Sequence, residues 1–213
     1  MIKPSYYCAL VFTFFSLTAA WSQAGTLLVM GDSISAGYGI KPNQAWPSLL
    51  QQRLKQAGNW QVINASISGE TTQGGRHRLP ALLQQLKPDW VLLELGGNDG
   101  LRGYPLSDVA ENLAAMIRQS QTAGAEVMLL GMRIPPNYGA RYTEPFFQQF
   151  QTLAKAHNIY LVPFLLEGIA TNPDLMQVDG IHPQASAQPL IMEAVWKVLK
   201  PLLVSVKLGI KVS

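Results

Sequence analysis

Four residues in three short segments of this sequence carry side chains that could act together on a carbonyl group. An apolar run, "LLVMGDS", ends in Ser33, which places a hydroxyl directly after an acid. Further along the chain, "GGNDG" holds the amide of Asn98, and "DGIHP" holds Asp179 and His182 three residues apart. A hydroxyl, an amide, a carboxylate and an imidazole are the side-chain types that acyl-transfer sites use.

The predicted nucleophile is Ser33, and His182 is its predicted base. A serine hydroxyl is a weak nucleophile until a neighbouring base takes its proton, and a neutral imidazole can do so near neutral pH. A carboxylate on the other ring nitrogen stabilises the imidazolium that forms and fixes the tautomer. Because Asp179 lies three residues before His182, one short loop can hold both groups. We therefore predict a triad of Ser33, His182 and Asp179.

Three groups could stabilise the oxyanion that forms when the hydroxyl attacks. They are the backbone N–H of Ser33, the backbone N–H of Gly69 and the side-chain amide of Asn98. A glycine suits position 69, since any side chain there would point into the space that the substrate occupies. Ser33 lacks the Gly-x-Ser-x-Gly elbow, so we expect it at the end of a strand rather than on a sharp strand-to-helix turn. We expect Asp32 to hold its loop by accepting backbone N–H bonds.

Short apolar runs alternate with amphipathic ones through the rest of the chain. The apolar runs predict five buried strands, at residues 26–30, 60–68, 89–97, 126–134 and 159–164. Helical spacing predicts helices within 45–58, ending before Pro88, from a Ser107 cap to Gly124, from a Thr143 cap through Leu153, and at 185–203. Strands that are apolar on both faces and are separated by helices indicate a parallel sheet covered on both sides.

We therefore predict an α/β fold with three layers, α/β/α, and a flavodoxin-like sheet of five parallel strands in the order 2-1-3-4-5. Ligands of such sheets bind beyond the carboxyl ends of the strands, where the strand order reverses. Ser33 follows the first predicted strand, Gly69 the second and Asn98 the third, and the segment with Asp179 and His182 comes after the fifth. Because the first and third strands are neighbours in this order, we expect Ser33 and Asn98 side by side.

Each segment alone has a simpler explanation. Gly-Asp-Ser and Gly-Gly-Asn-Asp-Gly are typical of turns, and Asp179 with His182 could form a surface ion pair or supply two metal ligands. A metal site is disfavoured because the other two histidines, His77 and His157, lie on predicted helices without obvious partners. The run "GETTQGGRHR" lacks the lysine pattern of a phosphate-binding loop. Since all the weak signals fall at one sheet edge, we predict a hydrolase site with no metal and no cofactor.

The segments Gly31-Asp32-Ser33, Gly69, Gly96-x-Asn98-Asp99 and Asp179-x-x-His182 resemble, in the same order, the four blocks of the SGNH, or GDSL, hydrolases. The longer runs "NASISGET", "LGGNDGLRG", "PPNYGARY" and "DGIHP" are similar to one branch, the bacterial periplasmic multifunctional esterases, which act as acyl-CoA thioesterase, protease and lysophospholipase. The resemblance covers residues 25–204 as a single SGNH hydrolase domain. It implies the SGNH hydrolase fold, the same triad and oxyanion hole, and hydrolysis of thioesters, aryl esters and lysophospholipids.

The sequence says less about the substrate. The predicted elements use nearly all of residues 25–204, which leaves no room for a lid domain, so we expect an open groove. We predict that Leu79, Pro80, Tyr138 and Tyr142 bind the acyl chain, although the tyrosines could equally pack only their own loop. The expected partners are small-molecule acyl esters and thioesters. Two other functions stay open: a carbohydrate O-acetylesterase, and a non-catalytic binding protein on the same scaffold.

Residues 1–24 have the pattern of a secretory signal peptide: Lys3, a short apolar run, and small residues at Ser22 and Ala24. The run is shorter than the roughly 20 residues that a membrane span needs. We therefore expect cleavage after Ala24, no stable membrane anchor and a periplasmic or secreted protein; an uncleaved N-terminal anchor is the alternative. The formal net charge of +3 without a clustered basic face disfavours nucleic acid as a partner. We expect a monomer with a C-terminal tail at 205–213.

Overall fold

Five parallel strands form the central sheet of the protein. The computed structural model describes residues 25–57 and 59–207. Within this part of the chain the strands are β1 (Gly25–Gly31), β2 (Trp60–Asn64), β3 (Trp90–Glu94), β4 (Glu126–Leu130) and β5 (Tyr160–Val162). They pair in the order β2-β1-β3-β4-β5, and every neighbouring pair is parallel. The predicted strand order and fold class are confirmed.

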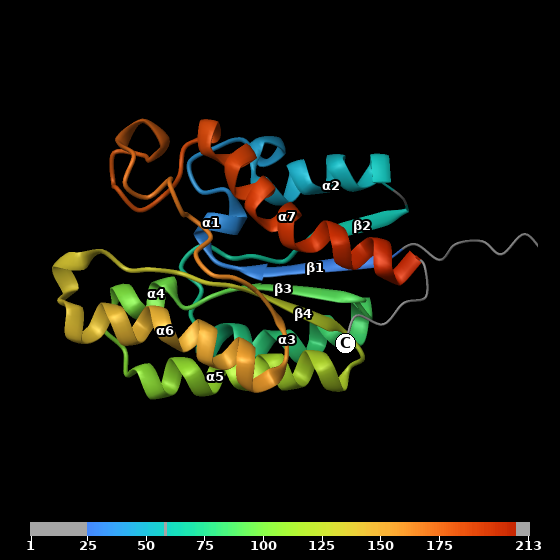
Figure 1. The fold of residues 1–213 in the computed structure, drawn as a ribbon, viewed down its shortest axis with the longest axis horizontal. Coiled ribbons are helices and arrows are strands. Elements are labelled where there is room, and N and C mark those ends of the chain that lie inside the picture. The colour runs from blue at the N-terminus through green and yellow to red at the C-terminus, as the bar shows by residue number, and fades with distance from the viewer. Residues whose placement is uncertain (1–24, 58, 208–213) are drawn as a thin grey trace, which may run out of the picture.

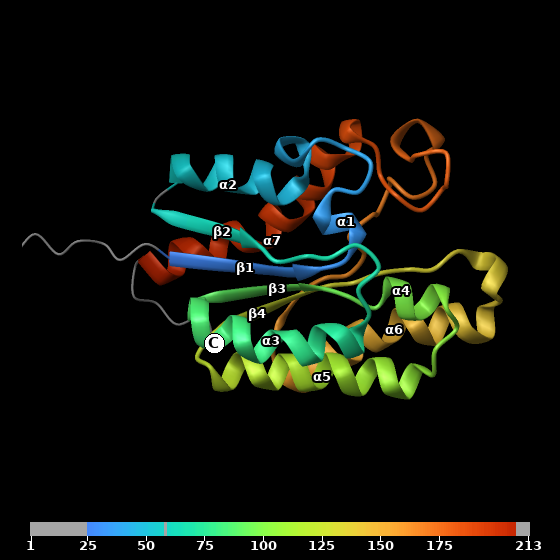
Figure 2. The same cartoon turned by 180° about the vertical axis from the view of Figure 1, so that it is seen from behind.

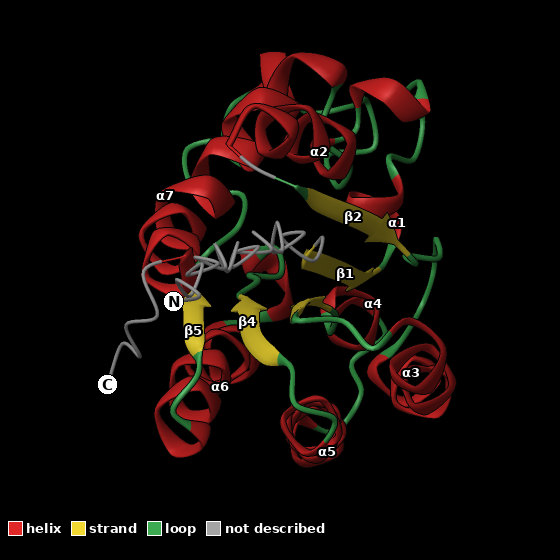
Figure 3. Cartoon of the chain, turned by 90° about the vertical axis from the view of Figure 1, so that its right-hand side faces the viewer, coloured by secondary structure: helices red, strands yellow, loops and turns green. Residues whose placement is uncertain are grey.

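Helices cover both faces of this sheet. The α-helices of the described residues are α1 (Ser33–Ala36), α2 (Trp46–Ala57), α3 (Thr72–Leu86), α4 (Gly97–Leu101), α5 (Leu106–Thr122), α6 (Ala140–His157) and α7 (Gln188–Lys207). Helices α2 and α7 lie on one face, and α3, α5 and α6 lie on the other, as Figure 1 and Figure 2 show from opposite sides. Figure 3 shows the same layers from one end of the strands.

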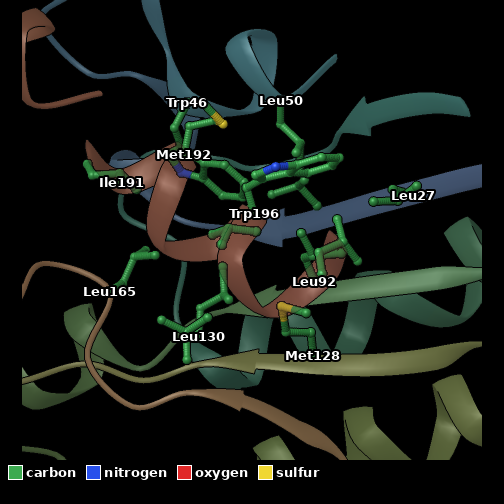
Figure 4. Packing of buried hydrophobic residues seen from close by; sticks show 14 of the residues in the cluster. Leu27, Trp46, Leu50, Leu92, Met128, Leu130, Leu165, Ile191, Met192 and Trp196 are labelled. Atoms are coloured by element: carbon green, nitrogen blue, oxygen red, sulfur yellow. The ribbon is translucent and has the colours of Figure 1, made fainter. Parts of the chain in front are cut away.

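Alternation along each strand directs side chains into two separate cores. In β1, Leu27 points into the cluster with α2 and α7, whereas Leu28 points into the cluster with α3, α5 and α6. The first cluster contains Trp46 of α2 and Trp196 of α7 (Figure 4). Burial of each large apolar side chain stabilises the fold by about 1.5–3 kcal/mol. Both cores together fix the strands, and therefore the loops at the strand ends.

Two features of the predicted strands need correction. The second to fifth predicted strands run too far: β2 ends at Asn64, β3 at Glu94, β4 at Leu130 and β5 at Val162. The residues beyond these points form loops at the carboxyl edge of the sheet, because the apolar runs continue past the last paired residue. In addition, β2 is an edge strand in which Gln61 and Asn64 are exposed, so it is not apolar on both faces.

Helix boundaries also differ from the prediction. Neither Ser107 nor Thr143 is a cap, because α5 begins just before the first and α6 begins before the second. The chain enters these helices after Pro105 and Gly139 instead. Proline suits such an entry because it has no N–H to leave unpaired. Helix α7 continues to Lys207, past the predicted domain end at 204.

The predicted signal peptide at 1–24 lies outside the described residues, and so does most of the predicted tail, at 208–213. None of the helices within residues 25–57 and 59–207 combines the length and the hydropathy that a membrane crossing requires.

Candidate active site

The turn after β1 carries Ser33 at the carboxyl edge of the sheet (Figure 1). Ser33 is the first residue of the short helix α1, and Asp32 caps this helix by accepting the Ile34 N–H at 3.0 Å. The expectation that Asp32 holds the turn is confirmed. The expectation that Ser33 avoids a strand-to-helix turn is wrong, since one turn of helix starts at the serine itself. Ser33 is nearly buried and faces a cavity.

The structure brings His182 into contact with both Ser33 and Asp179. The imidazole Nε2 lies 2.8 Å from the Ser33 Oγ, and Nδ1 lies 2.7 Å from the Asp179 Oδ2. When Nδ1 carries the ring proton and donates a hydrogen bond to the carboxylate, the unprotonated Nε2 can accept the proton of the serine hydroxyl. The three side chains are therefore arranged as a base between a nucleophile and an orienting acid.

One short loop holds Asp179 beside His182. The Asp179 Oδ1 accepts the backbone N–H of Ile181 at 2.9 Å and that of His182 at 3.0 Å. Desolvation raises the pKa of Asp179, but the hydrogen bonds from the His182 backbone and side chain and from the Ile181 backbone outweigh it, and the pKa falls to about 2. The carboxylate is therefore ionised at neutral pH and can stabilise an imidazolium.

Two buried carboxyl groups, Asp32 and Glu94, lie beneath the nucleophile turn. Glu94 ends β3 opposite Gly31, and its Oε2 accepts the Ser35 hydroxyl at 2.6 Å and the Asp32 N–H at 3.2 Å. Burial raises the pKa of Asp32 to about 6. Burial, together with the charge of Asp32, raises the pKa of Glu94 well above its usual value. The pair therefore favours a bound proton.

Sequence reasoning missed Glu94 and Ser35. Glu94 is the acidic last residue of the otherwise apolar run "WVLLE". Its position indicates a buried acid with polar partners, because a fully buried acid needs such partners. Ser35 connects it to α2: the Ser35 Oγ accepts the Trp46 Nε1–H at 3.1 Å while its own hydroxyl donates to Glu94. The nucleophile turn is thus tied to β3 and to α2 at once.

Asn98 and Gly69 approach the nucleophile turn from two further loops. Asn98, in α4, donates its Nδ2 to the Asp32 Oδ2 at 3.1 Å and lines the same cavity as Ser33. This bond uses one of the two amide hydrogens, so the other is free for a substrate oxygen. Gly69 has φ +81°, and a Cβ added to it would meet no atom within 4 Å. The N–H groups of Ser33 and Gly69 have no acceptor among the described residues.

Helix α3 fixes the loop that contains Gly69. Arg78 pairs with Glu70 at 2.6 Å across this loop. At the start of the helix, Asp99 accepts both the N–H and the hydroxyl of Thr72, at 2.9 and 2.6 Å. Asp99 therefore caps α3 and does not line the cavity that Ser33 faces.

A cavity of about 500 Å³ extends from Ser33 and His182 toward the loops that follow β4 and β5. Its walls are mostly apolar and include Met132, Ile134, Leu165, Leu166, Met176 and Ile181. In Figure 1 these two loops lie at the left end of the molecule, next to α1 and α4. A mostly apolar cavity that opens at a reactive hydroxyl fits an acyl chain.

None of the four residues predicted to bind the acyl chain lines this cavity. Leu79 is fully buried in the core between α3 and the sheet, and Pro80 lines a separate depression between α3 and α5. Tyr138 and Tyr142 donate their hydroxyls to backbone oxygens of the segment 101–104, at 2.9 and 2.7 Å. The tyrosines therefore join their loop to the segment 101–104, and the prediction that they bind the acyl chain is wrong, although Ile134 of the same loop does line the cavity.

Comparison with known proteins assigns the chain to a family. Residues 29–188 match the GDSL-like Lipase/Acylhydrolase family. The protein belongs to this family. It is 52% identical over 183 residues to the Esterase TesA of Pseudomonas aeruginosa, covering 85% of this chain and 91% of that protein. It is 46% identical over 186 residues to the thioesterase 1/protease 1/lysophospholipase L1 of Escherichia coli strain K12, covering 87% and 88%.

A solved structure of this GDSL family supports the assignment. The crystal structure of TesA superposes on the protein with a TM-score of 0.81, at 52% identity, and covers 83% of this chain and 99% of that chain. The resemblance to SGNH hydrolases that the motifs indicate is confirmed.

Proposed function

We propose that the protein hydrolyses carboxylic esters and thioesters through an acyl-enzyme on Ser33. The observation that carries this proposal is the continuous contact from Asp179 through His182 to Ser33, at 2.7 and 2.8 Å, at the mouth of an apolar cavity. The relatives named esterase and thioesterase support the same reaction class.

In the first half of the reaction, the Ser33 Oγ attacks the carbonyl carbon while the His182 Nε2 takes the hydroxyl proton. The negative charge that develops on the carbonyl oxygen faces the N–H groups of Ser33 and Gly69 and the free amide hydrogen of Asn98. Asp179 stabilises the imidazolium. His182 then gives its proton to the leaving oxygen or sulfur, the bond from carbon to this atom breaks, and the acyl group stays on Ser33.

In the second half, a water molecule attacks the acyl carbon, and His182 takes the water proton. The same oxyanion donors act again. When the tetrahedral intermediate collapses, the Ser33 oxygen leaves and receives its proton back from His182, and the carboxylic acid is released. No group beyond the described residues and water is required for the atoms and charges to balance.

The apolar cavity supports acyl esters, thioesters and lysophospholipids as the substrate class. An acyl chain of several carbons can lie against Met132, Ile134 and Leu165, where it leaves water. A carbohydrate O-acetylesterase would leave this space unfilled, because an acetyl group ends beside the serine. A binding protein would have no use for an ionised Asp179 held against the imidazole.

We include export in the proposal, because residues 1–24 carry the pattern of a signal peptide. The enzyme would act in the periplasm or outside the cell as a monomer. Cell fractionation followed by N-terminal sequencing of the purified protein tests both the compartment and cleavage after Ala24.

Covalent labelling tests the central proposal. Purified protein is treated with a fluorophosphonate, and the modified residue is mapped by mass spectrometry. We expect one label, on Ser33, together with loss of ester hydrolysis. Ser33→Ala should take no label and should not turn over substrate, whereas Ser107→Ala, on the exposed side of α5, should react like the wild type. A label on another residue, or hydrolysis by Ser33→Ala, would contradict the proposal.

A further inference from the structure

The ring of Tyr38 lies against the imidazole of His182 and has no part in the mechanism so far. The two ring centroids are 4.5 Å apart, and the ring planes are inclined at 38°. Tyr38 is nevertheless 53% exposed, so much of the side chain faces solvent directly beside the reacting groups. It does not line the apolar cavity.

The backbone holds Tyr38 in this position from both sides. Its N–H donates to the Ser33 carbonyl at 3.0 Å, and its carbonyl accepts the Gln177 Nε2–H at 2.8 Å. Gln177 also donates its backbone N–H to the His182 carbonyl, at 2.7 Å. Gly39, at φ +75°, lets Gln177 approach, because an added Cβ would collide with the Gln177 Oε1. These bonds fix the backbone of Tyr38 relative to the loop that carries His182.

The tetrahedral intermediate defines which part of a substrate meets this ring. The acyl chain extends into the cavity, and the oxyanion faces Asn98 and the two backbone N–H groups. The remaining substituent is the leaving group, and it must lie within reach of the His182 Nε2, because this atom protonates it. A leaving group beside the imidazole, but outside the apolar cavity, lies next to the exposed ring of Tyr38.

We propose that Tyr38 is the leaving-group subsite and that it favours aromatic alcohols and thiols. This inference rests on the proposed function and adds a preference on the side of the substrate opposite the acyl chain. An aromatic leaving group can stack on the exposed ring, and such ring pairs favour binding by about two- to tenfold. Because the backbone of Tyr38 is already held, binding need not order this segment.

A pair of esters with one acyl group tests this inference. We measure kcat/KM for phenyl butyrate and for ethyl butyrate and divide the value for the phenyl ester by the value for the ethyl ester. Tyr38→Ala should lower this ratio about two- to tenfold, and Tyr38→Leu should lower it as well. Tyr38→Phe keeps the ring and should keep the ratio. Tyr138→Ala, which removes an exposed tyrosine that does not touch His182, is the matched control and should leave the ratio unchanged.

The opposite outcomes would overturn the inference. If the ring only steadied the imidazole, Tyr38→Ala would slow the ethyl ester more than the phenyl ester, because an alkoxide is more basic and depends more on the proton from His182. The ratio would then rise. An unchanged ratio would equally exclude the subsite. Fluorophosphonate labelling of the wild type on Ser33 is run alongside: its failure would refute the proposed function, whereas normal labelling with no fall in the ratio refutes only the role of Tyr38.

Discussion

Two acidic side chains near Ser33, those of Asp179 and Asp32, lie in opposite environments. Asp179, whose side chain is 39% exposed, has a pKa near 2 because three hydrogen bonds outweigh its desolvation. Asp32, which is 2% exposed beneath the turn, has a pKa near 6 because burial outweighs its hydrogen bonds. The same chemical group is thus held charged on one side and pushed toward neutrality on the other.

This contrast separates a catalytic role from a structural one. In the proposed mechanism Asp179 must be charged, because it stabilises an imidazolium that exists only during the reaction. Asp32 and Glu94 act chiefly as acceptors that fix backbone, since they bond the Ile34 N–H, the Asp32 N–H and the Ser35 hydroxyl. Substitutions on the exposed side should therefore change turnover, and substitutions on the buried side should change stability and its pH dependence.

The largest expected effect is that of Asp179→Asn. The amide can donate to the Nδ1 of His182, which would move the imidazole proton to Nε2 and leave no acceptor for Ser33. In triad enzymes this exchange lowers kcat by about 10⁴-fold. The measurement is kcat with an aryl ester, with Asp174→Asn, an exposed acid in the same segment between β5 and α7, as the control. A loss smaller than tenfold would place the imidazolium stabilisation elsewhere.

A smaller effect on turnover is expected from Asn98→Ala, which removes both a bond to the buried carboxyl group and a proposed oxyanion donor. The amide donates to the buried Asp32, and in the proposed mechanism its other hydrogen faces the oxyanion. We expect kcat to fall by about 10²–10³ with KM little changed, because the lost donor acts on charge that appears only in the transition state. Steady-state kinetics on one ester give both constants, and Asn43→Ala, in the exposed segment before α2, is the control. A rise in KM at constant kcat would make Asn98 a ground-state binding residue instead.

The smallest effect concerns Glu94→Gln and appears in stability rather than turnover. The pKa values of Glu94 and Asp32 are higher in the folded state, so the folded protein binds protons more tightly than the unfolded chain. The free energy of unfolding should therefore fall as pH rises from about 4 through the raised pKa values of the two groups, that of Asp32 being about 6. Glu94→Gln should flatten this fall, which urea unfolding at several pH values measures. A slope equal to that of the wild type would mean that Glu94 does not take part.

Asp179 should act in the opposite direction and in a separate pH range. Its pKa is lowered in the folded state, so its contribution to stability is present above about pH 4 and is lost as the pH falls toward 2. The same urea series, extended to acid and repeated on Asp179→Asn, distinguishes the two ranges. If the variant lost as much stability as the wild type between pH 4 and 2, the hydrogen bonds to Asp179 would not be responsible.

Side-chain type and strand order were enough to predict that Ser33, Asn98, Asp179 and His182 converge, because the carboxyl ends of parallel strands must meet at one edge. They were not enough to predict which residues line the cavity for the substrate. Leu79, predicted to bind the acyl chain, lies in the core beneath α3, and a core residue cannot also line an outer groove.

Two further features were beyond the pattern of the sequence. The direction of the Tyr138 and Tyr142 rings depends on backbone oxygens at 101–104, which are distant in sequence and give no local signal. The contact between Tyr38 and His182 likewise depends on Gln177, whose side chain joins two loops across 139 residues. Contacts of this kind follow from the assembled fold and not from any window of the sequence.

The loops after β4 and β5 build most of the cavity wall, whereas Ser33, Gly69 and Asn98 come from the segments after the other three strands. Ser33, Asn98 and His182 line the cavity as well, so the two parts of this edge meet at the reactive groups. Evolution could therefore retune which acids the protein releases by exchanging residues within 131–136 and 164–176, while the attacking half stays constant. A library of variants confined to those two segments would change the selectivity for acyl-chain length and would leave Ser33 and its turn unaltered.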